Sequence, residues 1–345
     1  MMTNKNSVLL LYTGGTIGMS ENLCPMAFEQ VQKLLPELEQ TGVNITNFSF
    51  DPPIDSSDVD TDLWEKIARM IENNYDKFDG FVVLHGTDTM AYTASALSFM
   101  LENLAKPIIL TGSQLRIGEL RTDAKENLLN AIMLACGKNE FGEAMVPEVC
   151  VYFGDELYRG NRTTKKNAEH FSAFRSYNYP LLAKAGVHIK YFTSNIRYPD
   201  KSAKLCVRTK TDKNIAILKI FPGITQNAVS AVFSTTNLKA VVLESFGSGN
   251  VPQENTWFLN ELKKAIDKKI IIVNKTQCNS GSVEMGRYPA SQKLKDIGVI
   301  SAYDCTTEAI VTKLMCLLGE NKDLEKVNNL LKTDIAGEMT ISDSE

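Results

Sequence analysis

Small hydroxyl and acidic side chains follow directly after four predicted β-strands in the first half of the chain. They are Thr13 and Thr16, residues 56–58 (SSD), residues 87–89 (TDT) and Ser113. Neighbouring parallel strands lie about 4.8 Å apart, and their carboxyl ends meet at one edge of the sheet, where open α/β sheets bind ligands. We therefore expect these groups to converge on one small polar molecule that is held by hydrogen bonds.

The first of these strand ends has the most distinctive sequence. An apolar, β-rich run over residues 8–12 (VLLLY) stops abruptly at residues 13–16 (TGGT). Glycines have no Cβ, so the backbone can turn tightly there and lie close to a ligand. An isolated Gly-Gly more often marks an ordinary turn. It is the combination with the other strand ends that predicts a ligand site.

A threonine hydroxyl is a weak nucleophile unless a neighbouring group takes its proton. His85 is the only histidine near these strand ends. It lies within its predicted strand, where a hydrogen-bonded structural role is favoured over catalysis. Lys165 follows a glycine turn after another strand and is the better candidate for a proton relay. Beside Asp88, its amine could be held near the hydroxyl groups in a defined protonation state.

Strands and helices alternate along the chain, which indicates mostly parallel sheets covered by helices on both faces. Residues 191–214 lose this periodicity and gain Asn, Pro, Asp, Ser and Lys. They are predicted to link a catalytic α/β domain over residues 1–190 to a second α/β domain over residues 215–345. The predicted fold class is thus two α/β domains with mostly parallel sheets, of which the amino-terminal one is larger.

Composition and charge narrow the class of protein. At 345 residues, with 43% hydrophobic and 23% charged residues, the chain is typical of a soluble two-domain enzyme or binding protein. Its 37 basic and 41 acidic residues give a net charge of -4 without a basic stripe, which argues against nucleic acid as a partner. The longest apolar runs fall far short of the roughly 20 residues that span a bilayer, and the first seven residues lack a signal-peptide pattern. We therefore expect a cytoplasmic protein without a membrane partner.

Metal and nucleotide sites are not indicated. The seven cysteines are scattered without a C-x-x-C pair, and the three histidines are far apart in the sequence, which predicts reduced thiols and no metal site. The motifs GxGxxG and GxxxxGK[ST] occur at no predicted strand end, and this weakens the case for a dinucleotide or nucleotide site.

Two segments resemble the active-site signatures of the L-asparaginases, YTGGTIG at residues 12–18 and HGTDTM at residues 85–90. Three further segments, PIILTGSQ, LYRGNRTTK and NKTQC, are similar to those of the cytoplasmic bacterial type. The resemblance extends from Ser7 to about Thr340, and two separate signatures in the right order and at the right distance are highly specific. It implies the family fold of a larger amino-terminal and a smaller carboxyl-terminal α/β domain, assembled as a homodimer or homotetramer.

The resemblance also implies catalytic roles for the residues that match the signatures. Thr16 would be the nucleophile that attacks the side-chain amide carbon. Thr87, Asp88 and Lys165 would form a second triad that polarises hydroxyl groups or water. Backbone N–H groups near the glycine turn and Thr87 would donate to the developing oxyanion. The expected reaction is hydrolysis of L-asparagine to L-aspartate and ammonia through an acyl-enzyme, without a cofactor.

Substrate-binding roles follow from the same resemblance. Ser56 and Ser57, together with Thr87 and Asp88, would hold the α-carboxylate and α-amino groups of the substrate. Asn250, in the segment GSGN, matches a position that in some members reaches the site of a neighbouring subunit.

Three features depart from the family pattern. Some cytoplasmic members are activated by asparagine at a second site that uses an Arg where this chain has Glu244, although Thr276 and Cys278 of that region are present. We expect a vestigial effector pocket without activation. The loop over residues 19–27 is short and has no tyrosine to close over the nucleophile, so we expect a partly open site and a high KM. The third departure is Arg116, which stands where the family pattern has a proline.

Two kinds of alternative stay open. The first keeps the fold and changes the role, to a glutamine-preferring amidase or to the amidase subunit of a tRNA-dependent amidotransferase. Such subunits carry an extra amino-terminal domain, whereas seven residues precede the first predicted strand here. The second is a non-catalytic amino-acid sensor. The presence of every expected catalytic side chain favours an enzyme over a sensor.

Overall fold

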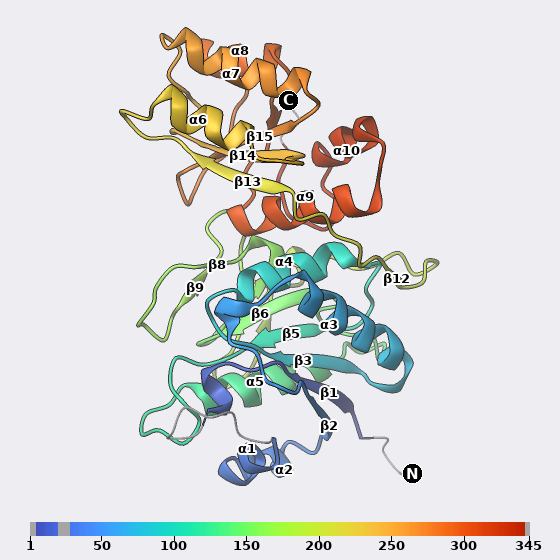
Figure 1. The fold of residues 1–345 in the computed structure, drawn as a ribbon. Helices are drawn as coiled ribbons and strands as arrows, with labels where there is room; N and C mark the ends of the chain where they lie inside the picture. The colour runs from blue at the N-terminus through green and yellow to red at the C-terminus, as the bar shows by residue number, and fades with distance from the viewer. Residues whose placement is uncertain (1–4, 20–27, 342–345) are drawn as a thin grey trace. The chain divides into compact units, whose positions relative to one another are not determined.

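The computed structural model describes residues 5–19 and 28–341 of the chain (Figure 1). The chain divides into two compact units, Met1–Thr209 and Lys210–Glu345. Both have an α/β architecture, as predicted, and the amino-terminal unit is the larger. Residues 191–209, expected as part of the linker, are counted with the first unit, in which β12 (Cys206–Val207) pairs with β4 (Leu101–Glu102).

The first unit is built on an eight-stranded sheet. Its strands, in spatial order, are β11 (Lys190–Tyr191), β10 (Ala183–Lys184), β7 (Glu156–Arg159), β6 (Val149–Phe153), β5 (Ile108–Thr111), β3 (Gly80–Leu84), β1 (Ser7–Tyr12) and β2 (Asn44–Ser49). The strands from β6 to β2 are parallel, which confirms the predicted sheet type, whereas β7, β10 and β11 extend it in antiparallel fashion. In the register, Leu84 lies opposite both Tyr12 and Thr111. The strand ends that carry the predicted site residues therefore lie side by side.

Helices cover both faces of this sheet (Figure 1). On one face, side chains that alternate along the strands, such as Val8, Leu10 and Val82, pack with α1 (Phe28–Leu34) and α5 (Ala124–Cys136) in a single core cluster. This is the face expected from the period-2 alternation of a strand. The opposite face is covered by α4 (Met90–Met100), and α3 (Thr61–Asn74) packs against α4. Nearly every side chain of α4 is buried, so this helix is enclosed, as its weak polarity predicts.

The second unit has a four-stranded parallel sheet in the order β13 (Ile215–Lys219), β14 (Ala240–Ser245), β15 (Ile271–Thr276) and β16 (Ile300–Ser301). Its helices are α6 (Gln226–Phe233), α7 (Thr256–Asp267), α8 (Pro289–Asp296), α9 (Thr307–Glu320) and α10 (Leu324–Leu331). Side chains of β14, β15 and α7, among them Val241, Ile272 and Phe258, form its core. The side chains of Thr225 and Thr306 cap α6 and α9 by accepting a backbone N–H three residues later.

Some elements are absent from the sequence-based prediction. The short hairpin of β8 (Thr164–Lys165) and β9 (Phe174–Arg175) has only two residues in each strand, which is too short for an alternating pattern. Helix α8 has proline at its start and only Ala290 and Leu294 as buried apolar residues, so its helical periodicity is weak. Helix α2 (Glu37–Gln40) is a single turn after α1.

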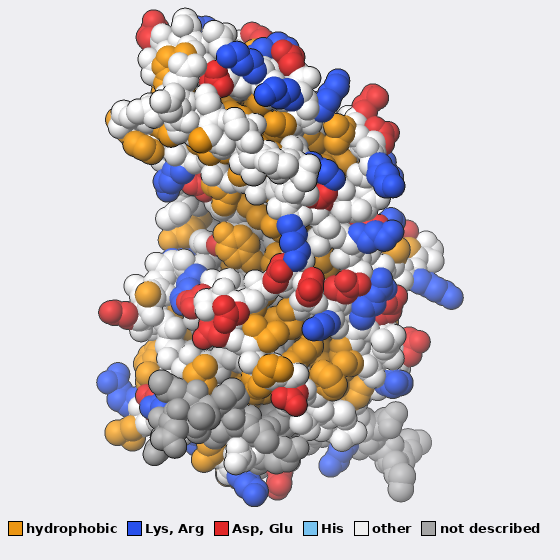
Figure 2. Space-filling model, in the orientation of Figure 1, with side chains coloured by type: hydrophobic (Ala, Val, Ile, Leu, Met, Phe, Trp, Pro, Cys, Tyr) orange, Lys and Arg blue, Asp and Glu red, His pale blue; other side chains and the backbone are white. Residues whose placement is uncertain are grey.

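On the face shown in Figure 2, acidic and basic side chains are interspersed over both units. Among the described residues on this face there is no extended basic patch of the kind that binds nucleic acid. Over residues 5–19 and 28–341, no helix combines the length and the apolar character that crossing a membrane requires.

Candidate active site

Thr13 ties together the segments that follow β1, β2 and β3. Its backbone N–H and its hydroxyl both donate to the carbonyl oxygen of Leu84, at 3.0 and 2.9 Å. Its own carbonyl oxygen accepts a hydrogen bond from the N–H of Ile54 at 2.7 Å. These strand ends therefore meet at one edge of the sheet, as predicted. Because the buried Thr13 hydroxyl is bonded to a carbonyl, its role here is structural.

Gly14 and Gly15 allow the loop after β1 to lie against two other backbone segments. Their φ angles are +135° and +92°, in the region that favours glycine. A Cβ on Gly14 would lie 2.1 Å from the carbonyl oxygen of Ile54, and one on Gly15 would lie 2.5 Å from the backbone nitrogen of Gly86. The two glycines therefore bring the next residue, Thr16, beside the segment that carries Thr87.

Thr16 is half-buried and begins a short 3-10 helix, Thr16–Gly18. Tyr12 supports this turn from the core side, since a Cβ on Gly18 would lie 2.3 Å from the Tyr12 hydroxyl oxygen. Burial raises the pKa of Tyr12 to about 12, so its hydroxyl is neutral. Tyr12 is therefore part of the core beneath the turn and does not cover Thr16 from the solvent side.

Lys165 joins two of the predicted site residues. Its Nζ donates to the Oγ1 of Thr87 at 2.8 Å and to the Oδ1 of Asp88 at 2.7 Å. The Lys165 side chain is 18% exposed, whereas that of Asp88 is 63% exposed and so reaches solvent. Lys165 stands on β8, paired with Phe174 of β9, which is buried against the ring of Phe153. The hairpin thus fixes the lysine above the end of β3.

His85 is buried at the end of β3 and does not face the solvent-exposed part of the site. Its Nε2 lies 2.9 Å from the Oγ1 of Thr93 on α4, and its Nδ1 lies 2.7 Å from the carbonyl oxygen of Gly86. Trp64 of α3 donates from Nε1 to the same Thr93 oxygen at 3.0 Å. Burial lowers the pKa of His85 to about 4, so the imidazole is neutral near pH 7. These contacts agree with the expected structural role.

The serine turn lies against the same segment. A Cβ on Gly86 would lie 2.5 Å from the Oγ of Ser56, and the carbonyl oxygen of Ser56 accepts a hydrogen bond from the Thr89 hydroxyl at 2.6 Å. Ser57 is exposed, and its N–H and hydroxyl both donate to Asp55 at 2.8 Å. These hydrogen bonds lower the pKa of Asp55. Ser56 is thus at the edge of the site, and the turn that includes Ser57 is held by Asp55.

Ser113, the fourth strand-end hydroxyl, is used within its own loop. It is buried and donates to the carbonyl oxygen of Leu115 at 2.5 Å. The adjacent Gln114 instead reaches outward, and its Nε2 donates to the carbonyl oxygen of His170 at 3.2 Å. Because His170 lies in the loop between β8 and β9, this bond connects the end of β5 to the hairpin that carries Lys165.

The residues of the expected effector pocket lie in the second unit. Glu244, near the end of β14, accepts a hydrogen bond from the Thr307 hydroxyl at 2.8 Å, and the Nζ of Lys219 is 3.6 Å from its other oxygen. The hydroxyl of Thr276 accepts the N–H of Cys278 at 3.0 Å. The Glu244 carboxylate is therefore already paired within its own unit.

The remaining predicted features have the following positions. Asn250 lies in the second unit, in a tight turn in which it exchanges backbone hydrogen bonds with Phe246. Arg116 forms an ion pair with Glu119. Within the described ranges, no group of three or more His, Cys, Asp or Glu side chains is placed to hold a metal ion. The short loop over residues 19–27 lies, apart from its first residue, outside the described residues.

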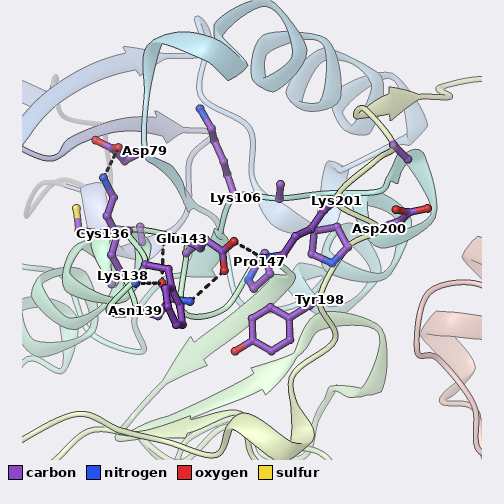
Figure 3. A pocket seen from close by; sticks show the side chains of 18 residues that line it. Asp79, Lys106, Cys136, Lys138, Asn139, Glu143, Pro147, Tyr198, Asp200 and Lys201 are labelled. Carbon is purple, nitrogen blue, oxygen red and sulfur yellow. Dashed lines mark hydrogen bonds and ion pairs between the residues drawn. The ribbon is translucent and has the colours of Figure 1, made fainter.

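A cavity of about 700 Å³ lies at the opposite edge of the same sheet (Figure 3). Its lining includes residues that precede strands, namely Asp79 before β3, Lys106 before β5 and Pro147 before β6. A strand of five residues, about 17 Å at 3.3 Å per residue, separates this edge from Thr87. Charged groups of the lining pair with one another, as Lys138 does with Asp79 at 2.8 Å. The cavity is therefore distinct from the site around Thr16 and Thr87.

Sequence reasoning does not find the partners of His85. Trp64 and Thr93 lie on two helices, and each fits the buried face of an ordinary amphipathic or enclosed helix. The only signal in the sequence is that Trp64 and Thr93, two side chains that can form hydrogen bonds, occupy positions expected to be buried. This does not identify His85 as the residue to which they connect. Contacts of this kind depend on how α3 and α4 pack.

Comparisons with known proteins agree with the geometry. A family model described as "Asparaginase, N-terminal" matches residues 7–197, and another described as "Glutaminase/Asparaginase C-terminal domain" matches residues 214–331. L-asparaginase 1 of Escherichia coli K12 is 44% identical over 345 residues, covering 98% of this chain and 99% of that protein.

Solved structures give the same result. L-asparaginase I from Vibrio cholerae has a TM-score of 0.89 at 42% identity and covers 98% of this chain and 100% of its own. The thermostable L-asparaginase from Thermococcus kodakarensis has a TM-score of 0.88 at 32% identity, with coverage of 97% and 100%. Since both family models match in order and full-length relatives exceed 30% identity, the chain belongs to the asparaginase family of hydrolases.

Proposed function

We propose that the chain hydrolyses the side-chain amide of L-asparagine to L-aspartate and ammonia. The observation that carries this proposal is the cluster in which Lys165 bonds both Thr87 and Asp88, next to the glycine turn that presents Thr16. The relatives named L-asparaginase support the choice of asparagine among amides.

Thr16 is the proposed nucleophile, and its hydroxyl attacks the amide carbon to form an acyl-enzyme. Thr87 is the proposed proton carrier. Its oxygen accepts from Lys165, so its own O–H is directed to another acceptor, such as a water molecule or the substrate. In acylation, Lys165 as an amine takes the proton of Thr16 through Thr87 and returns it to the leaving ammonia. In deacylation, it takes a proton from water in the same way and returns it to the hydroxyl of Thr16. The lysine and the hydroxyl thus act as one relay.

Substrate recognition follows from charge. Asp88 has a largely exposed carboxylate, which suits the α-ammonium group of an amino acid. The segment of Ser56 beside Gly86 is proposed to bind the α-carboxylate. Because both α-groups are then held at fixed positions, the length of the side chain determines whether its amide reaches the nucleophile. This arrangement is the proposed basis for a preference between asparagine and glutamine.

An assay of ammonia release across L-asparagine, L-glutamine and their D-forms tests the proposal. We expect kcat/KM to be highest with L-asparagine. A higher kcat/KM with L-glutamine would identify the chain as a glutamine-preferring amidase, and the absence of turnover with all four amides would favour a non-catalytic sensor. A cytoplasmic location, assembly as a homodimer or homotetramer, and a contact of Asn250 with a neighbouring site stay predictions.

A further inference from the structure

The hydrogen bonds around His85 determine which of its nitrogens carries the proton. A carbonyl oxygen can only accept, so the nitrogen facing the Gly86 carbonyl, Nδ1, must be protonated. A neutral imidazole then has an unprotonated Nε2, which accepts the hydroxyl proton of Thr93. The Thr93 oxygen in turn accepts from the indole N–H of Trp64. This series of hydrogen bonds therefore has one direction, from Trp64 through Thr93 and His85 to the carbonyl of Gly86.

The Gly86 carbonyl belongs to the peptide group that it shares with Thr87. A trans peptide group is planar, and its C=O and N–H point in opposite directions. Because His85 holds the carbonyl toward the buried side, the Thr87 N–H points to the opposite side. Among the described residues this N–H has no hydrogen-bond acceptor.

The rest of the Gly86 backbone is also restrained. The glycine turn lies against its nitrogen and Cα, and Ser56 lies against its Cα from another side. A Cβ on Gly86 would lie 2.6 Å from the Cβ of Ser56, so any other residue at this position would displace Ser56. These contacts limit where the peptide group can lie, and among the described residues the carbonyl oxygen of Gly86 has a hydrogen bond only from His85.

We propose that His85, held in its Nδ1–H tautomer by Thr93 and Trp64, is a positioning residue that directs the backbone N–H of Thr87 toward the oxyanion of the reaction. This inference rests on the proposed function, since it assigns the Thr87 N–H to the oxygen of the amide that is cleaved. His85 touches neither substrate nor reacting atoms and transfers no proton. Its contribution is to fix a donor before the reaction begins, which is how such donors stabilise a transition state.

Two substitutions of His85 distinguish a role in positioning the peptide group between Gly86 and Thr87 from a role in core packing alone. In His85→Asn, an amide N–H can occupy the place of Nδ1 and still donate to Gly86, whereas in His85→Gln the amide lies near Nε2 and reaches Thr93 instead. We expect His85→Gln to lose roughly tenfold in kcat with KM within about twofold, because a misdirected donor forfeits part of the 10²–10³ that such groups supply. His85→Asn should keep most of the wild-type kcat. Equal kcat values for the two variants would overturn the proposal.

The hydroxyl of Thr93 provides a matched pair on α4. Thr93→Val removes the donor to Nε2 at nearly constant volume, and Thr93→Ser keeps it. Ser98→Ala, which removes a hydroxyl that bonds only within the same helix, is the control. We expect Thr93→Val to lower kcat and Thr93→Ser and Ser98→Ala to leave it near the wild-type value. A Thr93→Val enzyme with wild-type kcat would contradict the role of the hydrogen bonds from Trp64 and Thr93 to His85.

Nuclear magnetic resonance can determine the tautomer of the His85 imidazole independently of any activity measurement. In the wild type, the ¹⁵N signals of His85 should show a protonated Nδ1 and an unprotonated Nε2, unchanged between pH 5.5 and 8. The amide signal of Thr87 should shift in Thr93→Val and His85→Gln and stay in place in Ser98→Ala. A protonated Nε2 would overturn the proposal even in an active asparaginase. An enzyme inactive on asparagine that shows these signals would overturn the proposed reaction and support the positioning of the N–H.

Discussion

Lys165 is the residue whose charge connects the hydroxyl and the carboxylate of the site. Its substitution by methionine keeps most of the volume and removes both hydrogen bonds, to Thr87 and to Asp88. We expect Lys165→Met to lower kcat by roughly 10²–10⁴, the range typical of a general acid–base group. The adjacent, exposed Lys166 is the control, and Lys166→Met should retain wild-type kcat. A fast Lys165→Met enzyme in the ammonia-release assay would return His85 to consideration as the base.

His85 also makes stability depend on pH. Burial lowers its pKa in the folded chain to about 4 from the ordinary histidine value of 6.5, so the unfolded chain binds more protons between these pH values. The contribution of His85 to the free energy of unfolding should therefore be complete above about pH 6.5. It should be lost as the pH drops toward 4, which lowers the free energy of unfolding by on the order of 3 kcal/mol. Urea unfolding of wild type and His85→Asn at a series of pH values measures this difference. Identical pH dependence in both proteins would show that His85 is not buried in neutral form.

A buried ion pair connects helix α9, which carries Lys313, to the segment after α10, which carries Glu338. Lys313 and Glu338 are both fully buried, with Nζ 2.5 Å from a carboxylate oxygen, and Lys313 also donates to the carbonyl of Thr333 at 2.7 Å. Glu338 accepts the N–H of Ala336 at 2.7 Å. Burial alone would raise the pKa of Glu338, but the charge of Lys313 and hydrogen bonds such as that from Ala336 outweigh it, so the pKa is lowered.

Removing one partner of this pair should cost more than removing both charges. Lys313→Met leaves a buried carboxylate without its cation and should lower the free energy of unfolding by about 3–5 kcal/mol. The double variant Lys313→Met/Glu338→Gln, which keeps an oxygen acceptor for Ala336, should recover part of this loss. Lys326→Met, at an exposed position of α10, should change stability little. A double variant less stable than Lys313→Met in urea unfolding would contradict this account.

At the carboxyl end of β14, Glu244 determines the expected response to an amino acid. Its carboxylate is paired with Thr307 and Lys219, so these groups are not free to hold the carboxylate of an effector. We expect hyperbolic kinetics, without activation by asparagine. A sigmoidal rate curve that Glu244→Gln or Thr276→Val abolishes would show that an effector site exists.

Elements with a strong local pattern could be predicted from the sequence, and those that depend on packing could not. The parallel strands before Thr13, Thr87 and Ser113 are continuous apolar runs, and the structure has them near the expected bounds. The hairpin that carries Lys165 consists of two-residue strands whose position depends on the burial of Phe174. Similarly, the hydroxyl of Ser113 is bonded within its own loop, a local geometry that residue type does not reveal.

For the whole molecule, the order of the two units and the convergence of strand ends follow from alternating strands and helices, because parallel strands place their carboxyl ends at one edge. The hydrogen bond between Lys165 and Thr87 joins residues 78 positions apart in the sequence. Reasoning from residue types proposed Lys165 as a proton relay beside Asp88, and the resemblance to a family named Thr87 as its hydroxyl partner. The high KM expected from a short loop over residues 19–27 stays a prediction, which steady-state kinetics with asparagine would check.

The central claim is that Thr16 and Thr87 together carry out amide hydrolysis, and ammonia release from L-asparagine by wild type, Thr16→Ala and Thr87→Ala tests it most directly. Both variants should fold, as judged by circular dichroism and urea unfolding. Each should lose at least roughly 100-fold in kcat, because removing one of several groups that act together costs about as much rate as removing all of them. If either folded variant retained kcat near that of the wild type, the role assigned to that threonine would be wrong.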